Sequence, residues 1–293
     1  MGTELISSGY SDLDSWPAGR ILRAIIDSNS HALEAVAKAL PQLEAAAELL
    51  RERLAAGGRL VYAGAGTSGR LALQDAAELP PTFGFSATVV LMAGGAEAGS
   101  AALEGAEDDA EGAAAAVREA RVGPADALIG VAASGRTPWT VTAVREARLA
   151  GAATVGIANN AGSPLLQSAE VEVLLETGPE VLAGSTRLAA GTAQKVALNA
   201  LSTTVLVQLG GAYGNLMVGM QPTNDKLRER AHVIVAEATG AGREEVGAAL
   251  AAADWEIKTA IVSLLGGAGV AEARAALAAA GGVVRQALGQ LRD

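Results

Sequence analysis

Short apolar runs alternate with longer amphipathic stretches through the middle of the chain. The apolar runs predict five strands, near residues 59–63, 87–92, 125–132, 153–158 and 171–175. The amphipathic stretches between them predict helices near residues 68–78, 98–121, 137–149 and 163–168. Strands that alternate with helices form a parallel sheet with helices on both faces. We therefore expect an α/β fold of three layers, αβα, around a five-stranded parallel sheet.

The segments on either side of this alternating region have a helical pattern. Residues 20–54 show helical periodicity broken at Pro41, which predicts two helices after a turn-rich arm, and residues 191–209 predict a long buried helix behind the sheet. From Asn224 onward, glycines separate five predicted short helices, near residues 226–238, 243–252, 255–265, 271–280 and 283–291. The expected organisation is an N-terminal arm with helices that pack on the core (1–56), an α/β domain (57–222) and a small helical C-terminal domain (223–293).

The composition excludes several kinds of site and partner. The chain has no cysteine, so disulfides and thiolate metal sites are impossible, and its two histidines, His31 and His232, cannot make a histidine-rich zinc site. The formal net charge of −10 argues against a nucleic-acid partner. The N-terminal residues are polar and acidic, and the longest apolar run, 196–209, is interrupted and too short to span a bilayer. We expect a cytoplasmic protein with no membrane partner.

The first predicted strand ends in a glycine-rich turn, Gly64–Gly69, that leads into a helix. Glycines let the backbone approach a ligand, and Thr67 and Ser68 can cap the helix or donate to an anion above its free N–H groups. The turn is therefore either a structural connection or a cradle for phosphate. Its spacing also matches the G-x-G-x-x-G pattern, but dinucleotide sites need an acidic residue at the end of the second strand. None stands in Leu91–Gly95, so we disfavour a dinucleotide.

A second loop of the same type favours the phosphate cradle. It follows the third predicted strand and comprises Ala133, Ser134, Gly135, Arg136, Thr137 and Pro138. Loops that follow parallel strands meet at the carboxyl edge of the sheet, so the two loops together suggest one phosphorylated ligand. A third cluster, Gly184–Arg187 with Gly191–Lys195, stands where the long helix begins. Its alternative interpretation is a helix cap with two surface cations.

Two glutamates stand out as candidates for proton transfer. Glu78 lies in the last turn of the helix after the first loop, where Pro80 and Pro81 are expected to stop that helix sharply. Glu107 follows the turn that closes the second strand. Paired carboxylates suit proton transfer at carbon and at a leaving oxygen when histidine and metal are scarce. Each could instead be a solvated charge, the interpretation that we accept for the neighbouring acidic residues Glu104, Asp108, Asp109 and Glu111.

Taken together, these motifs resemble the N-acetylmuramic acid 6-phosphate etherase family. The resemblance runs in order from the N-terminal arm into the helical tail. It is carried by the segments Gly64–Arg70, Asp75–Gly84, Ala93–Gly95, Glu104–Asp108, Ala132–Pro138, Gly184–Arg187, Gly191–Lys195, Gly214–Met217 and Thr223–Asn224. Leu79 and Phe83 depart from it, because cysteine and tyrosine are common at those places in the family. The resemblance implies a sugar isomerase (SIS) fold, a homodimer and a C-terminal three-helix region like a ubiquitin-associated domain.

The function that the resemblance implies is that of a lyase in cell-wall sugar recycling. Such an enzyme cleaves the lactyl ether at C3 of N-acetylmuramic acid 6-phosphate, giving N-acetylglucosamine 6-phosphate and D-lactate, with no metal or cofactor. The family's two catalytic glutamates fall on Glu78, the acid at the lactate oxygen, and Glu107, the base at C2. The residues expected to bind the substrate and its 6-phosphate are Gly66, Thr67, Ser68, Gly69, Ser134, Gly135, Thr137, Ser185 and Lys195, with the backbone N–H groups of Gly69 and Gly135 as donors.

Helical geometry separates Glu78 from the first loop. Glu78 lies ten residues beyond Ser68 on one predicted helix, which at about 1.5 Å per residue places them roughly 15 Å apart. Glu107 stands in a loop that can fold back over the site. We therefore expect each site to join the first loop and Glu107 of one subunit to Glu78 of its partner across a two-fold interface. Two other functions stay open, a non-catalytic sugar-phosphate sensor, as in the related glucokinase regulatory protein, and an aldose–ketose isomerase.

Overall fold

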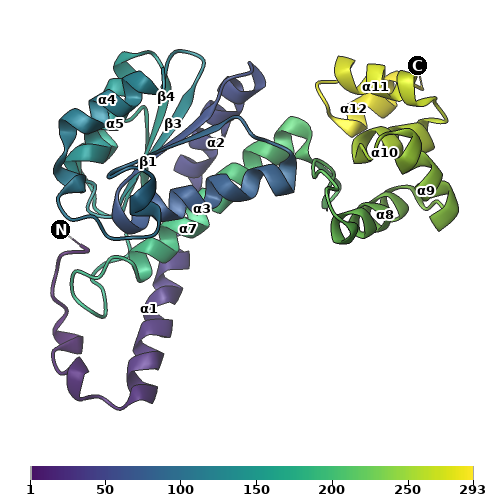
Figure 1. Cartoon of the computed structure of the whole chain (residues 1–293). Coiled ribbons are helices and arrows are strands. Elements are labelled where there is room, and N and C mark those ends of the chain that lie inside the picture. Colours follow the sequence, from purple (N-terminus) through teal and green to yellow (C-terminus); the bar gives the residue numbers. More distant parts are fainter. Residues whose placement is uncertain (1, 293) are drawn as a thin grey trace. The chain divides into compact units, whose positions relative to one another are not determined.

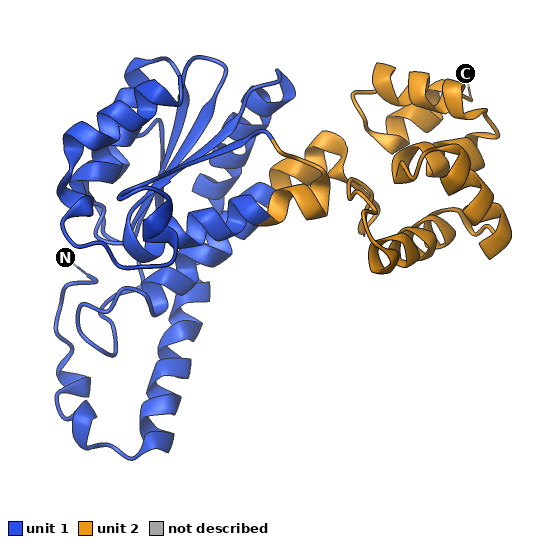
Figure 2. Ribbon diagram, viewed as in Figure 1, with its two compact units in different colours: residues 1–77, 87–202 blue, residues 78–86, 203–293 orange. Residues whose placement is uncertain are grey.

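A computed structural model of the chain describes residues 2–292. Figure 2 shows its two compact units. Unit 1 comprises the chain up to Ala77 together with Ala87–Ser202, and unit 2 comprises Glu78–Ser86 together with the chain from Thr203 onward. Two of the three boundaries between the units therefore fall inside helices, α3 (Gly66–Phe83) and α7 (Ala189–Leu206), and the third follows α3, between Ser86 and Ala87. The three-part division expected from the sequence stays a prediction.

Unit 1 is built on one five-stranded sheet. Its strands are β1 (Leu60–Gly64), β2 (Thr88–Met92), β3 (Ala127–Ala132), β4 (Ala153–Ala158) and β5 (Val171–Leu174). They lie in the order β2-β1-β3-β4-β5, and every neighbouring pair is parallel. Because helices cover both faces of a parallel sheet, its strands are continuous apolar runs, and β1, β3 and β4 are buried along their whole length. The expected fold class and all five expected strands are confirmed.

Helices cover both faces of the sheet and complete the three layers (Figure 1). Besides α3 and α7, the helices of unit 1 are α1 (Ala18–Lys38), α2 (Leu40–Ala55), α4 (Ala110–Glu119), α5 (Pro138–Leu149) and α6 (Pro164–Ser168). α4, α5 and α6 pack on one face, where Val61 and Ala63 of β1 enter the core. α2, α3 and α7 lie on the other face, toward which Tyr62 points. Side chains alternate along a strand, so each strand contributes to both cores.

The helix after β1 runs further than expected. α3 continues through Pro80 and Pro81 to Phe83, so the prediction that the two prolines stop it was wrong. A proline cannot donate to the carbonyl four residues before it, so α3 lacks hydrogen bonds there but does not end. It ends at Gly84, which takes a positive φ of 68° and donates its N–H to the Pro80 carbonyl at 3.0 Å. Glu78 therefore lies inside α3 and not in its last turn.

The segment between β2 and β3 is less helical than expected. A helix was predicted near residues 98–121, but α4 begins only at Ala110, after two 3-10 turns, η3 (Ala96–Gly99) and η4 (Ala106–Asp108). Asp109 caps α4, because its Oδ1 accepts a hydrogen bond from the Gly112 N–H at 2.8 Å. The segment before this cap is thus a loop, and it carries Glu107 within η4.

Unit 2 contains the helices that were predicted for the C-terminal part. They are α8 (Asp225–Thr239), α9 (Arg243–Ala252), α10 (Ile257–Gly266), α11 (Val270–Ala279) and α12 (Val284–Gln290). A π-helical turn, η5 (Val207–Gly211), and a short hairpin of β6 (Ala212–Tyr213) and β7 (Leu216–Met217) precede them and were not predicted. The five helices bury side chains in a core of their own, to which Val218 and Met220 also contribute. The likeness to a ubiquitin-associated domain stays a prediction.

No single helix within residues 2–292 is long and apolar enough to cross a membrane. α10 and α11 reach that length and composition only as a pair, which is bent by 107° at its break.

Candidate active site

The loop after β1 packs tightly against its own helix. A side chain on Gly64 would meet the Gly69 backbone at 2.9 Å, so neither position has room for one. The Gly69 N–H donates to the Ala65 carbonyl at 3.0 Å, which closes the first turn of α3. Within the described chain, the N–H groups of Gly66, Thr67 and Ser68 donate to no backbone carbonyl. These first-turn groups, and not the Gly69 N–H, are the donors that α3 offers to an anion.

Ser68 is held in a buried chain of hydrogen bonds. Its hydroxyl, in a residue only 8% exposed, donates to Oε1 of Gln194 in α7 at 2.8 Å. Gln194 Nε2 then donates to Oδ1 of Asn159 at 2.9 Å, and Asn159 Nδ2 donates to the Leu175 carbonyl at 2.8 Å. These hydrogen bonds tie the first turn of α3, through α7, to the ends of β4 and β5. They orient the Ser68 hydroxyl, whose oxygen can still accept a further hydrogen bond.

The second loop is also closed by hydrogen bonds of its own. The Gly135 N–H donates to the Ala132 carbonyl at 3.0 Å, and the Ser134 oxygen accepts the Arg136 N–H at 3.1 Å. Thr137 precedes α5, whose first residue is Pro138, a favoured first position for proline. The Thr137 side chain makes no capping hydrogen bond to α5. The Gly135 N–H is therefore already used, whereas the Ser134 and Thr137 hydroxyls can still donate.

The sheet topology brings the two loops to one place. β1 and β3 are neighbours in the middle of the sheet. After β1 the chain goes to β2, on one side of this pair, and after β3 it goes to β4, on the other side. In open parallel sheets, ligands bind at the carboxyl edge where the strand order reverses in this way. The first loop follows β1 and the second follows β3, so both border that point.

A small pocket in unit 1 contains Glu107. Its volume is about 270 Å³. The start of α3 forms one wall, with Gly66, Thr67 and Arg70, and the loop after β2 forms another, with Glu104 and Glu107. Glu107 is exposed, so its carboxylate can reach a ligand in the pocket. The structure thus brings Glu107 together with the first loop. This is the arrangement expected if the loop that carries Glu107 folds back over the site.

Glu78 and the third cluster are not among the described residues that line this pocket. Glu78 is exposed and belongs to unit 2, while Glu107 belongs to unit 1. In the third cluster Ser185 is half-buried and Lys195 is exposed. The start of α7 beside them is already occupied, because the buried Glu180 carboxylate accepts the N–H groups of Ala189 and Ala190 at 3.0 and 2.9 Å. A phosphate at that helix start would meet this negative charge, which weakens the expectation for Ser185 and Lys195.

Sequence reasoning missed the buried polar residues that support the site. Asp75 accepts hydrogen bonds from the Tyr62 hydroxyl at 2.7 Å, from Asn199 Nδ2 at 2.6 Å and from the Ser202 hydroxyl at 3.2 Å, which joins β1, α3 and α7. Burial, and then the charge and hydrogen bond of Asp75, raise the pKa of Tyr62 well above its ordinary value. The motif segments contain Asp75 and Gln194, but no local pattern marks which distant residues they meet.

The N-terminal arm is also anchored at this edge of the sheet. Thr3 is fully buried, and its N–H donates to Oδ1 of Asn160, just after β4, at 3.2 Å. Asn160 Nδ2 donates in turn to the Thr3 hydroxyl at 2.6 Å and to the Ala133 carbonyl of the second loop at 3.0 Å. The arm therefore supports the second loop.

Among residues 2–292, no group of three or more histidine, cysteine, aspartate or glutamate side chains is placed to hold a metal ion.

The chain is similar to proteins with SIS domains. Residues 42–147 match the glucokinase regulatory protein N-terminal SIS domain, and residues 109–204 match the SIS domain. A solved protein of E. coli CFT073 has a TM-score of 0.50 at 17% identity, and the match covers 68% of this chain and 97% of that protein. That likeness shows the fold alone.

Full-length relatives give a closer comparison. The N-acetylmuramic acid 6-phosphate etherase of Deinococcus radiodurans is 50% identical over 290 residues, which cover 98% of this chain and 95% of the relative. That of Rubrobacter xylanophilus is 50% identical over 292 residues, 99% of this chain and 96% of the relative. With this identity along nearly its whole length and with the SIS fold in unit 1, the chain belongs to the N-acetylmuramic acid 6-phosphate etherase family.

Proposed function

We propose that the protein cleaves the D-lactyl ether of N-acetylmuramic acid 6-phosphate to give N-acetylglucosamine 6-phosphate and D-lactate, a step of cell-wall sugar recycling. Etherases of this name are about half identical to the chain over nearly its full length. The observation that carries the proposal is the pocket in which Glu107 faces the start of α3. It combines a carboxylate with N–H donors that have no other partner among residues 2–292, the two elements that a proton transfer on a sugar phosphate requires.

The proposed reaction is an elimination followed by addition of water, which makes the protein a carbon–oxygen lyase. In the open-chain sugar the C1 aldehyde acidifies the C2 hydrogen, and Glu107 removes it as the general base. The electron pair forms the C2–C3 double bond and expels the lactyl oxygen from C3. Glu78 protonates that oxygen, and D-lactate leaves. Water then adds to C3, and a proton returns to C2.

The 6-phosphate is proposed to lie between the two loops. At the start of α3 the free N–H groups of Gly66, Thr67 and Ser68 point toward an anion, and the helix dipole favours negative charge there. Ser134 and Thr137 add hydroxyl donors from the second loop. Gly69 and Gly135 contribute by letting the backbone turn closely, because both of their N–H groups are used internally. Ser185 and Lys195 are proposed as outer contacts.

The proposed active form is a homodimer in which Glu78 acts in trans. The prediction came from the spacing of Ser68 and Glu78 along one helix. Both residues lie in α3, which continues past Glu78 to Phe83. At about 1.5 Å per residue, a helix holds Glu78 roughly 15 Å from Ser68, too far for C3 of a hexose whose phosphate is bound there. Glu78 of the partner subunit would then supply the acid. We place the reaction in the cytoplasm, since a charged sugar phosphate does not cross a bilayer unaided.

A non-catalytic sugar-phosphate sensor is the second candidate, because residues 42–147 match the SIS domain of glucokinase regulatory protein. An aldose–ketose isomerase would share the abstraction of the C2 proton. An enzymatic assay of D-lactate released by the purified protein from N-acetylmuramic acid 6-phosphate separates the three functions. An etherase should release D-lactate, and its Glu107→Gln variant should not. Binding of the substrate without release would favour the sensor, and conversion of an aldose 6-phosphate with a free 2-hydroxyl, such as glucose 6-phosphate, to its ketose would favour the isomerase.

A further inference from the structure

The pocket that contains Glu107 also holds a positive charge that the proposed reaction does not use. Among the described residues that line it, Arg70 is the one cation, and it faces a pocket that also contains Glu104 and Glu107. The whole chain carries a formal charge of −10. An anionic group that enters this pocket therefore meets two carboxylates, and Arg70 is the charged side chain that can offset them beside the N–H groups at the start of α3.

Two hydrogen bonds fix the direction of the Arg70 guanidinium. Its Nε–H donates to the Ala98 carbonyl at 3.0 Å, and Nη2 donates to the Ala101 carbonyl at 2.7 Å. Both acceptors belong to the loop that leads to Glu107. One edge of the guanidinium is thus used, and the end formed by Nη1 and Nη2 remains. In the part of the chain that the structure describes, Nη1 makes no hydrogen bond. That end is the fork with which arginine binds a carboxylate through two parallel bonds.

We infer that Arg70 binds the lactyl carboxylate and so determines specificity for the muramic acid ether; this inference rests on the proposed function. The carboxylate carbon of the lactyl group is bonded to the carbon that carries the ether oxygen, and that oxygen is attached to C3, next to C2. A base at C2 and a cation at the carboxylate must therefore lie in the same small space. Glu107 and Arg70 line one pocket of about 270 Å³.

The assignment also explains how the site distinguishes this substrate from its product. N-acetylglucosamine 6-phosphate has the same phosphate but no carboxylate, so it leaves the Arg70 fork without a partner. After cleavage the carboxylate departs with D-lactate, and the bonds to Arg70 are lost together with the ether. A neutral amide at the same place can accept through its carbonyl oxygen only, so one N–H of the fork loses its acceptor and the opposite charge is gone, which disfavours the amide.

The test compares two substrates in two enzymes. The first is N-acetylmuramic acid 6-phosphate, and the second is its analogue in which the lactyl carboxylate is a primary amide. The kcat/KM of wild type should favour the acid over the amide by about 10- to 100-fold, the size expected for bonds between charged partners. In Arg70→Met this preference should disappear, whatever the absolute rate. Damage to the loop would lower kcat/KM for both substrates alike, so it cancels in the ratio of the two values. Arg118→Met, in which an exposed arginine of α4 outside the pocket is removed, should keep it.

A preference for the acid that is the same in Arg70→Met as in wild type would overturn the assignment, and so would a wild type that accepts both substrates equally. Such a result leaves the proposed function intact, because wild type would still release D-lactate. If wild type releases no lactate or lactamide from either substrate, the proposed function itself fails, and the assignment fails with it.

Discussion

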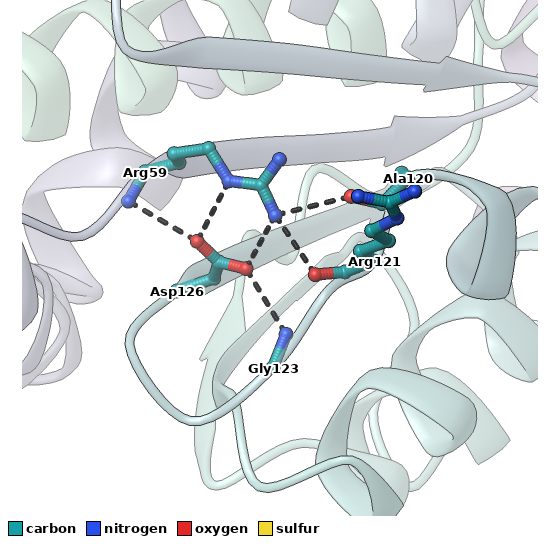
Figure 3. Close-up of polar contacts among 5 residues, drawn as sticks. All are labelled: Arg59, Ala120, Arg121, Gly123 and Asp126. Atoms are coloured by element: carbon teal, nitrogen blue, oxygen red, sulfur yellow. Dashed lines mark hydrogen bonds and ion pairs between the residues drawn. The ribbon is translucent and has the colours of Figure 1, made fainter.

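Asp126→Asn should destabilise unit 1 through an ion pair at the edge of the sheet opposite the candidate site. Asp126 precedes β3 and Arg59 precedes β1, and Figure 3 shows their contacts. Arg59 Nε donates to Oδ1 at 2.9 Å, Nη2 donates to Oδ2 at 2.8 Å, and the Gly123 N–H also donates to Oδ2, at 3.0 Å. Asp126 is 4% exposed, so water cannot replace these donors. In the asparagine variant an NH₂ group would face them.

The magnitude follows from the burial of the two partners. Removing one partner of a buried ion pair costs about 3–5 kcal/mol. The Arg59 side chain is 36% exposed and can recover part of its hydration. We therefore expect a loss at the lower end, about 3 kcal/mol of unfolding free energy at neutral pH.

The loss should depend on pH in a defined direction. Burial alone would raise the pKa of Asp126, but hydrogen bonds from the Arg59 side chain and from the Gly123 and Arg59 N–H groups, with the charge of Arg59, lower it. A carboxyl whose pKa is lower in the folded state stabilises that state above its unfolded pKa of about 3.9. This contribution is lost as the pH falls through the folded-state pKa. The difference between wild type and variant should therefore be largest near pH 7 and should shrink below about pH 4.

Urea unfolding in a Trp255→Phe background measures the effect, because Trp16 and Trp139 then report on unit 1 alone. Glu48→Gln, which removes the exposed partner of Arg51 on α2, is the matched control and should change the transition far less. A loss below about 1 kcal/mol, the range of exposed pairs, would refute the reasoning. A loss that stays constant from pH 7 to pH 3 would refute it as well.

Four further predictions concern the site. Ser134→Ala should weaken the binding of N-acetylglucosamine 6-phosphate by about 1–3 kcal/mol, measured by calorimetry, and unchanged affinity would exclude Ser134 from the phosphate site. By NMR in deuterated water, Glu78→Ala should still exchange the C2 hydrogen of that product and Glu107→Ala should not; the reverse pattern would exchange their functions. Mixing these two inactive variants after dissociation should restore D-lactate release at up to about a quarter of all sites, while verified subunit exchange without regained activity would place Glu78 in cis. Exhaustive dialysis against a chelator should leave D-lactate release unchanged, and a loss that zinc or magnesium restores would contradict the two-glutamate mechanism.

The sheet could be predicted because its signal is local. Each buried strand is a short apolar run between turns, and the loops after β1 and β3 follow from strand ends alone. The expectation that Pro80 and Pro81 end the helix was wrong for α3. The cost of Pro80 and Pro81 is a local loss of hydrogen bonds, and the surrounding structure tolerates it until Gly84 ends the helix.

The supporting contacts of the site could not be predicted, because they join residues far apart in the sequence. Ser68 meets Gln194 across 126 positions, and Thr3 meets Asn160 across 157. Hydroxyl and amide side chains at these places look like ordinary polar residues until the fold brings them together. Glu180 is a similar case, since nothing local marks it as the group that occupies the start of α7.

The measurement that tests the central claim most directly is the fate of the ether oxygen. The protein is incubated with N-acetylmuramic acid 6-phosphate in water labelled with ¹⁸O, and both products are analysed by mass spectrometry. Elimination at C3 followed by addition of water predicts one label in N-acetylglucosamine 6-phosphate, on C3, and none in the D-lactate hydroxyl. To correct for exchange of the open-chain aldehyde oxygen, the product is treated in the same labelled water without the substrate. Label in the lactate hydroxyl, or no release of D-lactate, would contradict the proposed function.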